Sequence, residues 1–205
     1  MIEEPLLYRN ETLQSIRQRH SIRQFTEQTI GEEDLLTILN AANHAPSAHN
    51  QQSWRFTVIT GSKKQELVDL VSERSSGFPK PNSTLLRMAA RSISSAPIVI
   101  AVMNTGELIG RVDTLYENER EKARDFFRIM EIQSSAAAVE NMLIAATSIG
   151  LASVWLGILI LIQQDVLAFL NNPNGEFMAV VPVGYAERPS SGPKKRTLDD
   201  VVRYS

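Results

Sequence analysis

The sequence predicts an α+β fold in which a central sheet is wrapped by helices. Residues 97–103, PIVIAVM, form a continuous apolar run between turn signals, which is typical of a strand buried on both faces. From about Ala123 a long helix is expected, ending at a stop at Gly150, and residues 134–149 are apolar on nearly every side, so it should cross the core. Helices and strands mix without a strict βαβ rhythm, which favours α+β.

The first half of the chain contains signals for several short elements. A short helix is expected before Arg19, with Asn10 or Thr12 as its cap. A second apolar helical face spans residues 35–42, and that helix must end before Pro46. The stretch WRFTVIT, residues 54–60, alternates in polarity and is β-branched, which indicates a strand.

The remaining elements follow in chain order. Ser62 and Gln65 have the spacing of a capping box that would open the next helix. Residues 78–82 hold two prolines and are expected to form a loop before another short helix. Further along we expect a strand at 151–155, a helix at 163–170, a strand at 177–185, a loop at 189–196 and a terminal arm at 197–205.

Composition narrows the class of protein. The 205 residues are most simply one domain, residues 1–205, with 43% hydrophobic and 21% charged residues. The balance of 21 basic and 23 acidic residues offers no general attraction to nucleic acid or to membranes. No cysteine is present, and neither a signal sequence nor an apolar run long enough for a membrane span is found, so a cytoplasmic protein is expected.

Several familiar functional motifs are missing. The chain has no G-x-G-x-x-G after a strand, no phosphate-binding G-x-x-x-x-G-K-[ST] loop and no G-x-S-x-G elbow. The three histidines do not form H-E-x-x-H, so no metal site is predicted.

Four stretches combine residues that are suited to binding a ligand. They are RHSIRQF (19–25), APSAHNQQSWRF (45–56), GLASVWLG (150–157) and GPKKR (192–196). Each has a plain structural explanation: a basic helix end, a connecting loop, a buried strand between glycines, and an exposed basic turn. Taken singly, these alternatives remain open.

In this order and spacing, the four stretches resemble the nitroreductase family of FMN-dependent oxidoreductases. Residues 19–25 meet its pattern R-[RH]-S-x-R-x-F in full. Residues 45–56 meet A-P-S-x-x-N-x-Q-P-W-x-F, except that Ser53 replaces a proline. The pattern N-M-L-x-A-A followed by G-L-[GA]-[ST]-x-W-x-G is met within residues 141–157, and a late V-G-Y precedes the basic K-x-R at 194–196. The resemblance extends from about residue 10 to the end.

The resemblance implies a phosphate site for FMN, built from both ends of the chain. Arg19 and Arg196 would each present a planar guanidinium to the phosphate, and Lys194 would add a point charge. His20 and Ser21 would donate to phosphate or ribityl oxygens.

The resemblance also implies how the flavin ring is held. Arg23 would face N1 and O2 of the ring, where charge develops when the flavin is reduced. Pro46, Ser47 and Asn50 would line and hydrogen-bond the ring, and the backbone near Leu156 and Gly157 would meet N5, the atom that accepts hydride.

The family resemblance implies a central mixed sheet, an obligate homodimer with two FMN sites at the subunit interface, and hydride transfer from NAD(P)H to a nitroaromatic, quinone or similar acceptor. This reaction needs no catalytic acid or base, so no catalytic residue is predicted. Alternatives are a dehalogenating or FMN-fragmenting enzyme of the same fold, and a non-catalytic flavin-binding module. Residues 104–128 match no family motif, and we expect them to cover the pocket and set acceptor choice.

Overall fold

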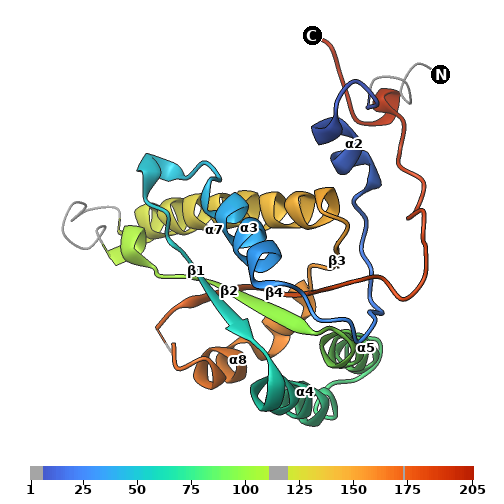
Figure 1. Ribbon diagram of the computed structural model, residues 1–205. Helices are drawn as coiled ribbons and strands as arrows, with labels where there is room; N and C mark the ends of the chain where they lie inside the picture. The colour runs from blue at the N-terminus through green and yellow to red at the C-terminus, as the bar shows by residue number, and fades with distance from the viewer. Residues whose placement is uncertain (1–6, 111–119, 173) are drawn as a thin grey trace.

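The computed structural model describes residues 7–110, 120–172 and 174–205. Within them, a four-stranded sheet with helices on both faces confirms the expected α+β fold (Figure 1). The strands are β1 (Trp54–Ile59), β2 (Ile98–Asn104), β3 (Ala152–Ser153) and β4 (Glu176–Gly184). The α-helices are α2 (Glu11–Gln18), α3 (Glu32–Asn43), α4 (Gly61–Ser75), α5 (Asn82–Ser95), α7 (Arg120–Ser148) and α8 (Gln163–Phe169). The same described residues also contain the short 3-10 helices η1 (Ala48–Asn50), η2 (Gly157–Ile162) and η3 (Leu198–Asp200).

The sheet has the strand order β1-β2-β4-β3, and each neighbouring pair is antiparallel. Ile100 of β2 lies opposite Val58 of β1 on one side and Val181 of β4 on the other. The mixed character implied by the resemblance is limited, in the part of the chain that is described, to an isolated parallel bridge between Ser21 and Ser153. That bridge attaches the segment after α2 to the β3 edge of the sheet.

Strand β2 lies at the centre of two hydrophobic cores, as the run PIVIAVM predicts. All seven of its residues are buried. Val99 and Ala101 contribute to the core shared with α4, α5 and α8, whereas Ile98, Ile100 and Val102 contribute to the core shared with α3 and α7. The alternation of side chains along a strand therefore produces one helical layer on each face of the sheet (Figure 1).

Helix α7 is the long helix that the sequence predicts. Ala138, Met142 and Ala146 are fully buried between α3 and the sheet. Gly150, with φ +81°, follows the helix end, and the Leu151 amide donates to the Ala146 carbonyl at 2.8 Å, an arrangement that closes the last turn. Although α7 spans 29 residues, no helix of the described chain is apolar enough over sufficient length to cross a membrane.

The start of α4 differs from the prediction, and the capping box of Ser62 and Gln65 is wrong. Thr60 occupies the N-cap in an extended conformation (φ −140°, ψ 174°), and the helix begins at Gly61. Ser62 therefore lies inside the first turn, whereas an N-cap needs a non-helical backbone. By contrast, Asn10 caps α2 as predicted, since its side chain accepts a 2.9 Å hydrogen bond from the backbone.

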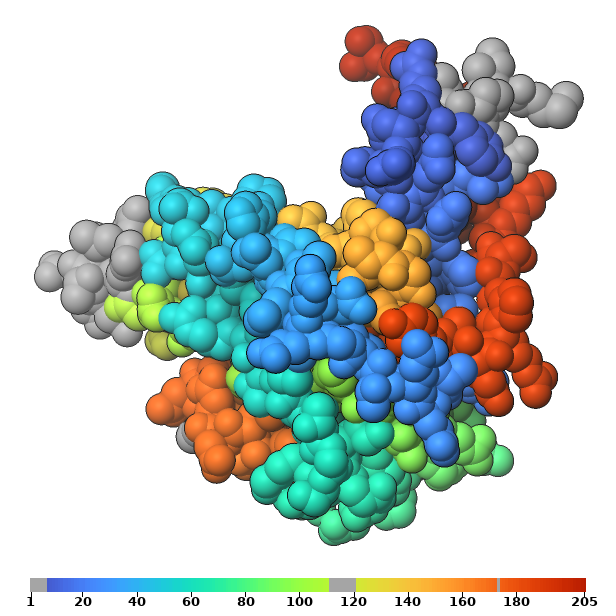
Figure 2. Space-filling model, viewed as in Figure 1, coloured from blue at the N-terminus to red at the C-terminus, as the bar shows by residue number. Residues whose placement is uncertain are grey.

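The two ends of the described chain lie together at one corner of the molecule. Figure 1 shows α2 beside the C-terminal segment, and Figure 2 shows both projecting from the body. In η3, Thr197 and Asp200 form a reciprocal capping box. Leu198, Val201 and Tyr204 are exposed in the same segment. This corner therefore displays apolar side chains that the single chain leaves in solvent.

The segment 104–128, predicted to cover the pocket, is only partly described. Residues 111–119 lie outside the described residues, so the proposed cover stays a prediction. Before this gap, the Leu108 amide donates to Oε1 of Glu131 at 2.9 Å. Glu131 is fully buried on α7, and burial raises the pKa of its carboxyl group.

Candidate functional site

Backbone hydrogen bonds hold the segment after α2 against the segment after β4. The Thr26 amide donates to the Tyr185 carbonyl at 2.9 Å, and the Glu187 amide donates to the Gln24 carbonyl at 3.1 Å. These bonds align two parts of the chain that are about 160 residues apart in sequence, as the residue numbers show. Side chains from both segments can therefore line the same cavities.

The first cavity, which we name the tail pocket, lies between the end of α2 and the C-terminal segment and has a volume of about 590 Å³. Among the described residues, only cationic and uncharged side chains line it. This charge favours an anion. Its lining residues are Leu7, Arg17, Gln18, Arg19, His20, Ser190, Ser191, Gly192, Pro193, Lys194, Lys195 and Arg196.

The tail pocket brings together four of the five residues predicted to bind phosphate: Arg19, His20, Lys194 and Arg196. Ser21, the fifth, lines the adjoining cavity. Local sequence alone does not bring these four side chains together, because two of them precede the sheet in the sequence and two follow it. The tertiary path of the chain places all four around one cavity.

His20 presents an unused nitrogen at this site. Its Nδ1 lies 2.6 Å from the Gln18 carbonyl oxygen, and its Nε2 is buried without a hydrogen-bond partner. Gly192 crosses directly beside the ring: a Cβ built on Gly192 would lie 2.8 Å from Cβ of His20, and the glycine has φ +67°. A buried polar atom without a partner is costly, so a ligand oxygen at Nε2 would remove an existing penalty.

Arg19 already has an acidic neighbour. Its Nε lies 3.5 Å from Oε1 of Glu140 on α7, and the Arg19 side chain is only 20% exposed. The pairing restricts the guanidinium, whose remaining donors can bind an anion. Glu140 also places a negative charge close to any phosphate in the tail pocket.

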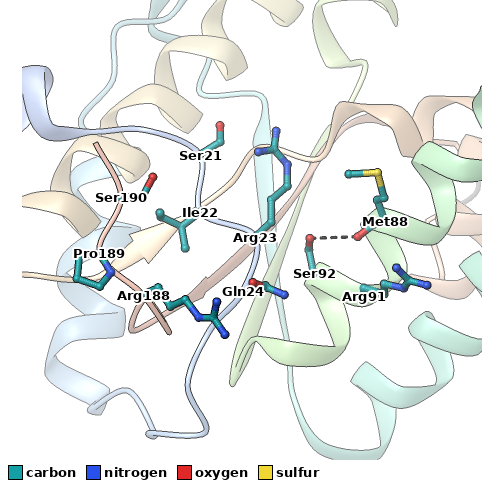
Figure 3. A pocket seen from close by; sticks show the side chains of 10 residues that line it. All are labelled: Ser21, Ile22, Arg23, Gln24, Met88, Arg91, Ser92, Arg188, Pro189 and Ser190. Carbon is teal, nitrogen blue, oxygen red and sulfur yellow. Dashed lines mark hydrogen bonds between the residues drawn. The ribbon is translucent and has the colours of Figure 1, made fainter. Parts of the chain in front are cut away.

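The second cavity, which we name the arginine pocket, has a volume of about 370 Å³. Figure 3 shows its three walls: the segment after α2, one side of α5, and the segment after β4. Arg23, Arg91 and Arg188 come one from each wall, alongside the apolar side chains Ile22 and Met88. Its lining residues are Ser21, Ile22, Arg23, Gln24, Met88, Arg91, Ser92, Arg188, Pro189 and Ser190.

The two cavities adjoin each other. Residues 17–20 line the tail pocket and residues 21–24 line the arginine pocket, while Ser190 lines both. We name these two neighbouring cavities together the trough, since both are lined by the same two chain segments. The tail pocket is strongly cationic, and the arginine pocket is both apolar and cationic. Such a trough suits a ligand with an anionic tail and a flat ring.

Pro46, Ser47 and Asn50 line neither cavity. Figure 1 shows their loop, at η1, on the opposite side of the molecule from α2 and the C-terminal segment. The loop is held there by its own contacts: the Ser47 hydroxyl accepts from the Gln52 amide at 3.1 Å, and the Ala48 amide donates to the Ser134 hydroxyl of α7 at 3.2 Å. A single chain therefore does not bring this loop to the trough.

Leu156 and Gly157 also lie outside the lining of both cavities. The Leu156 side chain is buried, and its amide donates to the Val180 carbonyl at 2.9 Å. That amide is committed to the sheet edge. Of the two backbone groups predicted to meet the flavin, Gly157, at the start of η2, is thus the better candidate.

Sequence reasoning missed the contribution of α5 and of Arg188, three residues after the late V-G-Y motif. Met88, Arg91 and Ser92 line the arginine pocket from α5, and Arg188 lines it from the segment after β4. Met88, Arg91 and Ser92 are three and four residues apart, so they lie on one helical face, and this spacing could have been found in the sequence. The structure adds that Met88 is exposed. Within the described residues, no cluster of three His, Asp or Glu side chains has the arrangement of a metal site.

Comparison with known proteins gives consistent matches. The sequence model of the nitroreductase family matches residues 16–185. A protein of Archaeoglobus fulgidus assigned to the NADH dehydrogenase/NAD(P)H nitroreductases is 33% identical over 149 residues, 72% of this chain and 68% of the relative. A crystal structure from Desulfovibrio desulfuricans, assigned as a nitroreductase and in complex with FMN, is 27% identical, with a TM-score of 0.73 and coverage of 96% of this chain and 97% of the other. A more distant relative, a 5,6-dimethylbenzimidazole synthase of Rhodospirillum rubrum, is 25% identical over 192 residues, 88% of this chain and 84% of the relative.

Proposed function

The chain belongs to the nitroreductase family, and from this premise we propose that it is an FMN-dependent oxidoreductase that transfers hydride from NAD(P)H to an aromatic or quinone acceptor. The observation that carries the proposal is the trough formed by the tail pocket and the arginine pocket. The cationic tail pocket suits a phosphate, and the arginine pocket, which is both apolar and cationic, suits a flat heterocycle. The related structure from Desulfovibrio desulfuricans is in complex with FMN, which supports this choice of ligand.

The residues of the tail pocket would hold the phosphate of FMN. Arg19 and Arg196 would each donate to phosphate oxygens, and Lys194 would contribute a further positive charge. His20 would use its unpartnered Nε2, donating to a phosphate oxygen when protonated and accepting from a ribityl hydroxyl when neutral. Ser21, next along the trough, would donate to a ribityl or phosphate oxygen.

The arginine pocket would hold the flavin ring. When bound, FMN supplies the redox chemistry, since N5 of its ring accepts and releases hydride. Arg23 projects from the segment after α2 into the space facing α5 (Figure 3), where its cation would stabilise negative charge on the pyrimidine edge of the ring. Ile22 and Met88 would exclude water from the ring face. We assign no acid or base among these residues, because hydride transfer requires none.

The remaining predicted residues support a homodimer. Pro46, Ser47 and Asn50 lie across the molecule from the trough of their own chain, so they would reach a flavin only in a second copy. Three non-glycine residues of this loop have positive φ: His49, Asn50 and Gln52. An L-residue in that region costs about 1 kcal/mol, so the loop is held in a defined, unfavourable shape of the kind found at binding sites.

The function is tested by the absorption spectrum of the purified protein and by NAD(P)H oxidation. We expect a yellow protein that binds about one FMN per chain and oxidises NADH or NADPH in the presence of menadione. A folded protein that remains colourless with added FMN would refute the oxidoreductase assignment. A yellow protein without turnover would instead indicate a non-catalytic flavin-binding module.

The homodimer is tested by light scattering on the FMN-loaded protein. We expect about twice the chain mass of 22.9 kDa, and loss of FMN when the chains are separated by dilution. A stable monomer that retains FMN and full activity would contradict the shared site.

A further inference from the structure

The arginine pocket contains more positive charge than a flavin ring requires. Arg23, Arg91 and Arg188 all line it, and no carboxylate does so among the described residues. None of the three side chains forms an ion pair or a hydrogen bond within the described part of the chain. The FMN phosphate has its own cations in the tail pocket, and Arg23 is sufficient for the single charge of a reduced ring. Arg91 and Arg188 are left over.

The chain holds Arg188 at the pocket through backbone contacts. The Glu187 amide donates to the Gln24 carbonyl at 3.1 Å, and an antiparallel bridge pairs Ala186 with Phe25. Arg188 follows directly, and Figure 3 shows its guanidinium pointing from this segment towards Gln24. Its position is therefore set by the sheet edge rather than by a free loop.

Arg91 approaches the same cavity from the opposite wall. It lies on α5 one residue before Ser92, whose hydroxyl donates to the Met88 carbonyl at 3.1 Å. In Figure 3 the Arg91 guanidinium lies on the far side of Gln24 from Arg188. Both arginines are exposed, as Arg23 is, so a ligand that enters from solvent can reach their guanidinium groups.

We propose that Arg91 and Arg188, on two walls of the arginine pocket, form an anion-binding subsite that selects a substrate carrying a phosphate or carboxylate group. The proposal rests on the proposed function, because the substrate meant is the one that docks against the bound flavin. Two substrates supply this chemistry: a reduced nicotinamide cofactor with a 2′-phosphate, and an aromatic acceptor with a carboxylate. Guanidinium groups bind either group through paired hydrogen bonds.

The expected effect follows from exposure. Hydrogen bonds to charged groups change affinity by about tenfold or more each, and screening of exposed side chains reduces the effect to the lower end of that range. We therefore expect that an anionic ligand binds about tenfold more tightly than its neutral or less charged counterpart, and that removing both arginines abolishes this preference.

The experiment compares matched ligand pairs by isothermal titration calorimetry at one ionic strength, with FMN added to saturation. NADP⁺ is paired with NAD⁺, and 4-nitrobenzoate is paired with 4-nitrobenzyl alcohol. The proteins are wild type, the double variant Arg91→Gln/Arg188→Gln, and Arg188→Lys, which keeps the charge but not the paired donors. Arg87→Gln is the matched control, since Arg87 is exposed on the same helix but does not line the pocket.

The expected result is a preference for the anionic member of one pair in wild type and in Arg87→Gln, a smaller preference in Arg188→Lys, and none in the double variant. The pair that responds identifies whether the cofactor or the acceptor carries the recognised anion. The proposal is overturned if wild type shows no preference in either pair, or if the double variant keeps it. The FMN content and NAD(P)H oxidation of wild type are measured separately, so failure of the oxidoreductase assignment is distinguished from failure of the subsite.

Discussion

Replacing Arg196 by alanine tests the phosphate site most directly. Arg196 is exposed, lines the tail pocket and forms no ion pair within the described residues, so its removal should leave the rest of the fold unchanged. Arg19 is a less simple target, because it lies 3.5 Å from Glu140 and its loss would also free that carboxylate.

The magnitude follows from the number of charge-assisted bonds. Each hydrogen bond to a charged group contributes about 1.5–3 kcal/mol, so Arg196→Ala should weaken FMN binding by roughly ten- to a hundredfold. Arg19→Ala should weaken it by more, because Glu140 then repels the phosphate without compensation. Glu140→Gln should strengthen FMN binding by at most about fivefold, since an ion pair that is partly open to solvent contributes about 1 kcal/mol or less.

The assay is the affinity for FMN and for riboflavin, measured by flavin fluorescence at one fixed ionic strength. Riboflavin lacks the phosphate, so its affinity should change little in any of these variants. Arg203→Ala is the control, because Arg203 is exposed on the same terminal segment and does not line the tail pocket. Unchanged FMN affinity in both arginine variants would refute the phosphate site. Equal losses for both flavins would mean that the arginines maintain the fold instead.

Three further predictions concern the supports of the site and of the fold. Gly192→Ala should weaken FMN binding by about tenfold, measured by the same titration. The backbone of Gly192 has φ +67°, and a Cβ added there would lie only 2.8 Å from Cβ of His20. Burial holds the pKa of Glu131 above its ordinary value of 4.5, so the folded chain binds this proton more tightly and the free energy of unfolding falls as pH rises above that value. Glu131→Gln should flatten this dependence in urea unfolding between pH about 5 and about 8, and an unchanged slope would contradict the assignment. Lys64→Met should lower the free energy of unfolding by about 1 kcal/mol, because Lys64 donates to two carbonyl groups at the end of α5, whereas Lys63→Met, at a surface ion pair, should change it by less than about 0.5 kcal/mol.

Local patterns were enough to predict most of the elements. Six of the seven residues of the run PIVIAVM, 98–103, lie in β2 and are buried, and the long apolar helix that stops at Gly150 is α7. The strand was predictable because a strand buried on both faces has an almost continuously apolar sequence. The end of the helix was predictable because the residue after a helix often has a left-handed backbone, which favours glycine. The capping box at Ser62 failed because the pattern cannot tell which of several neighbouring polar residues adopts the extended N-cap conformation. Here that residue is Thr60.

The sequence by itself determined the family, because its motifs are local and occur in the family's order along the chain. It also predicted which residues would hold a phosphate, namely those of the motif at 19–25 and the K-x-R at 194–196. Only the tertiary structure decided which residues meet. A backbone bond between Gln24 and Glu187 holds the segment after α2 against the segment after β4, which places Arg188 at the arginine pocket. Helix α5 adds Arg91 to the same pocket. The same structure places the loop at 46–50 on the opposite side of the molecule. Such contacts depend on how the sheet is ordered and which edge each segment joins, and no local pattern of residues encodes that choice.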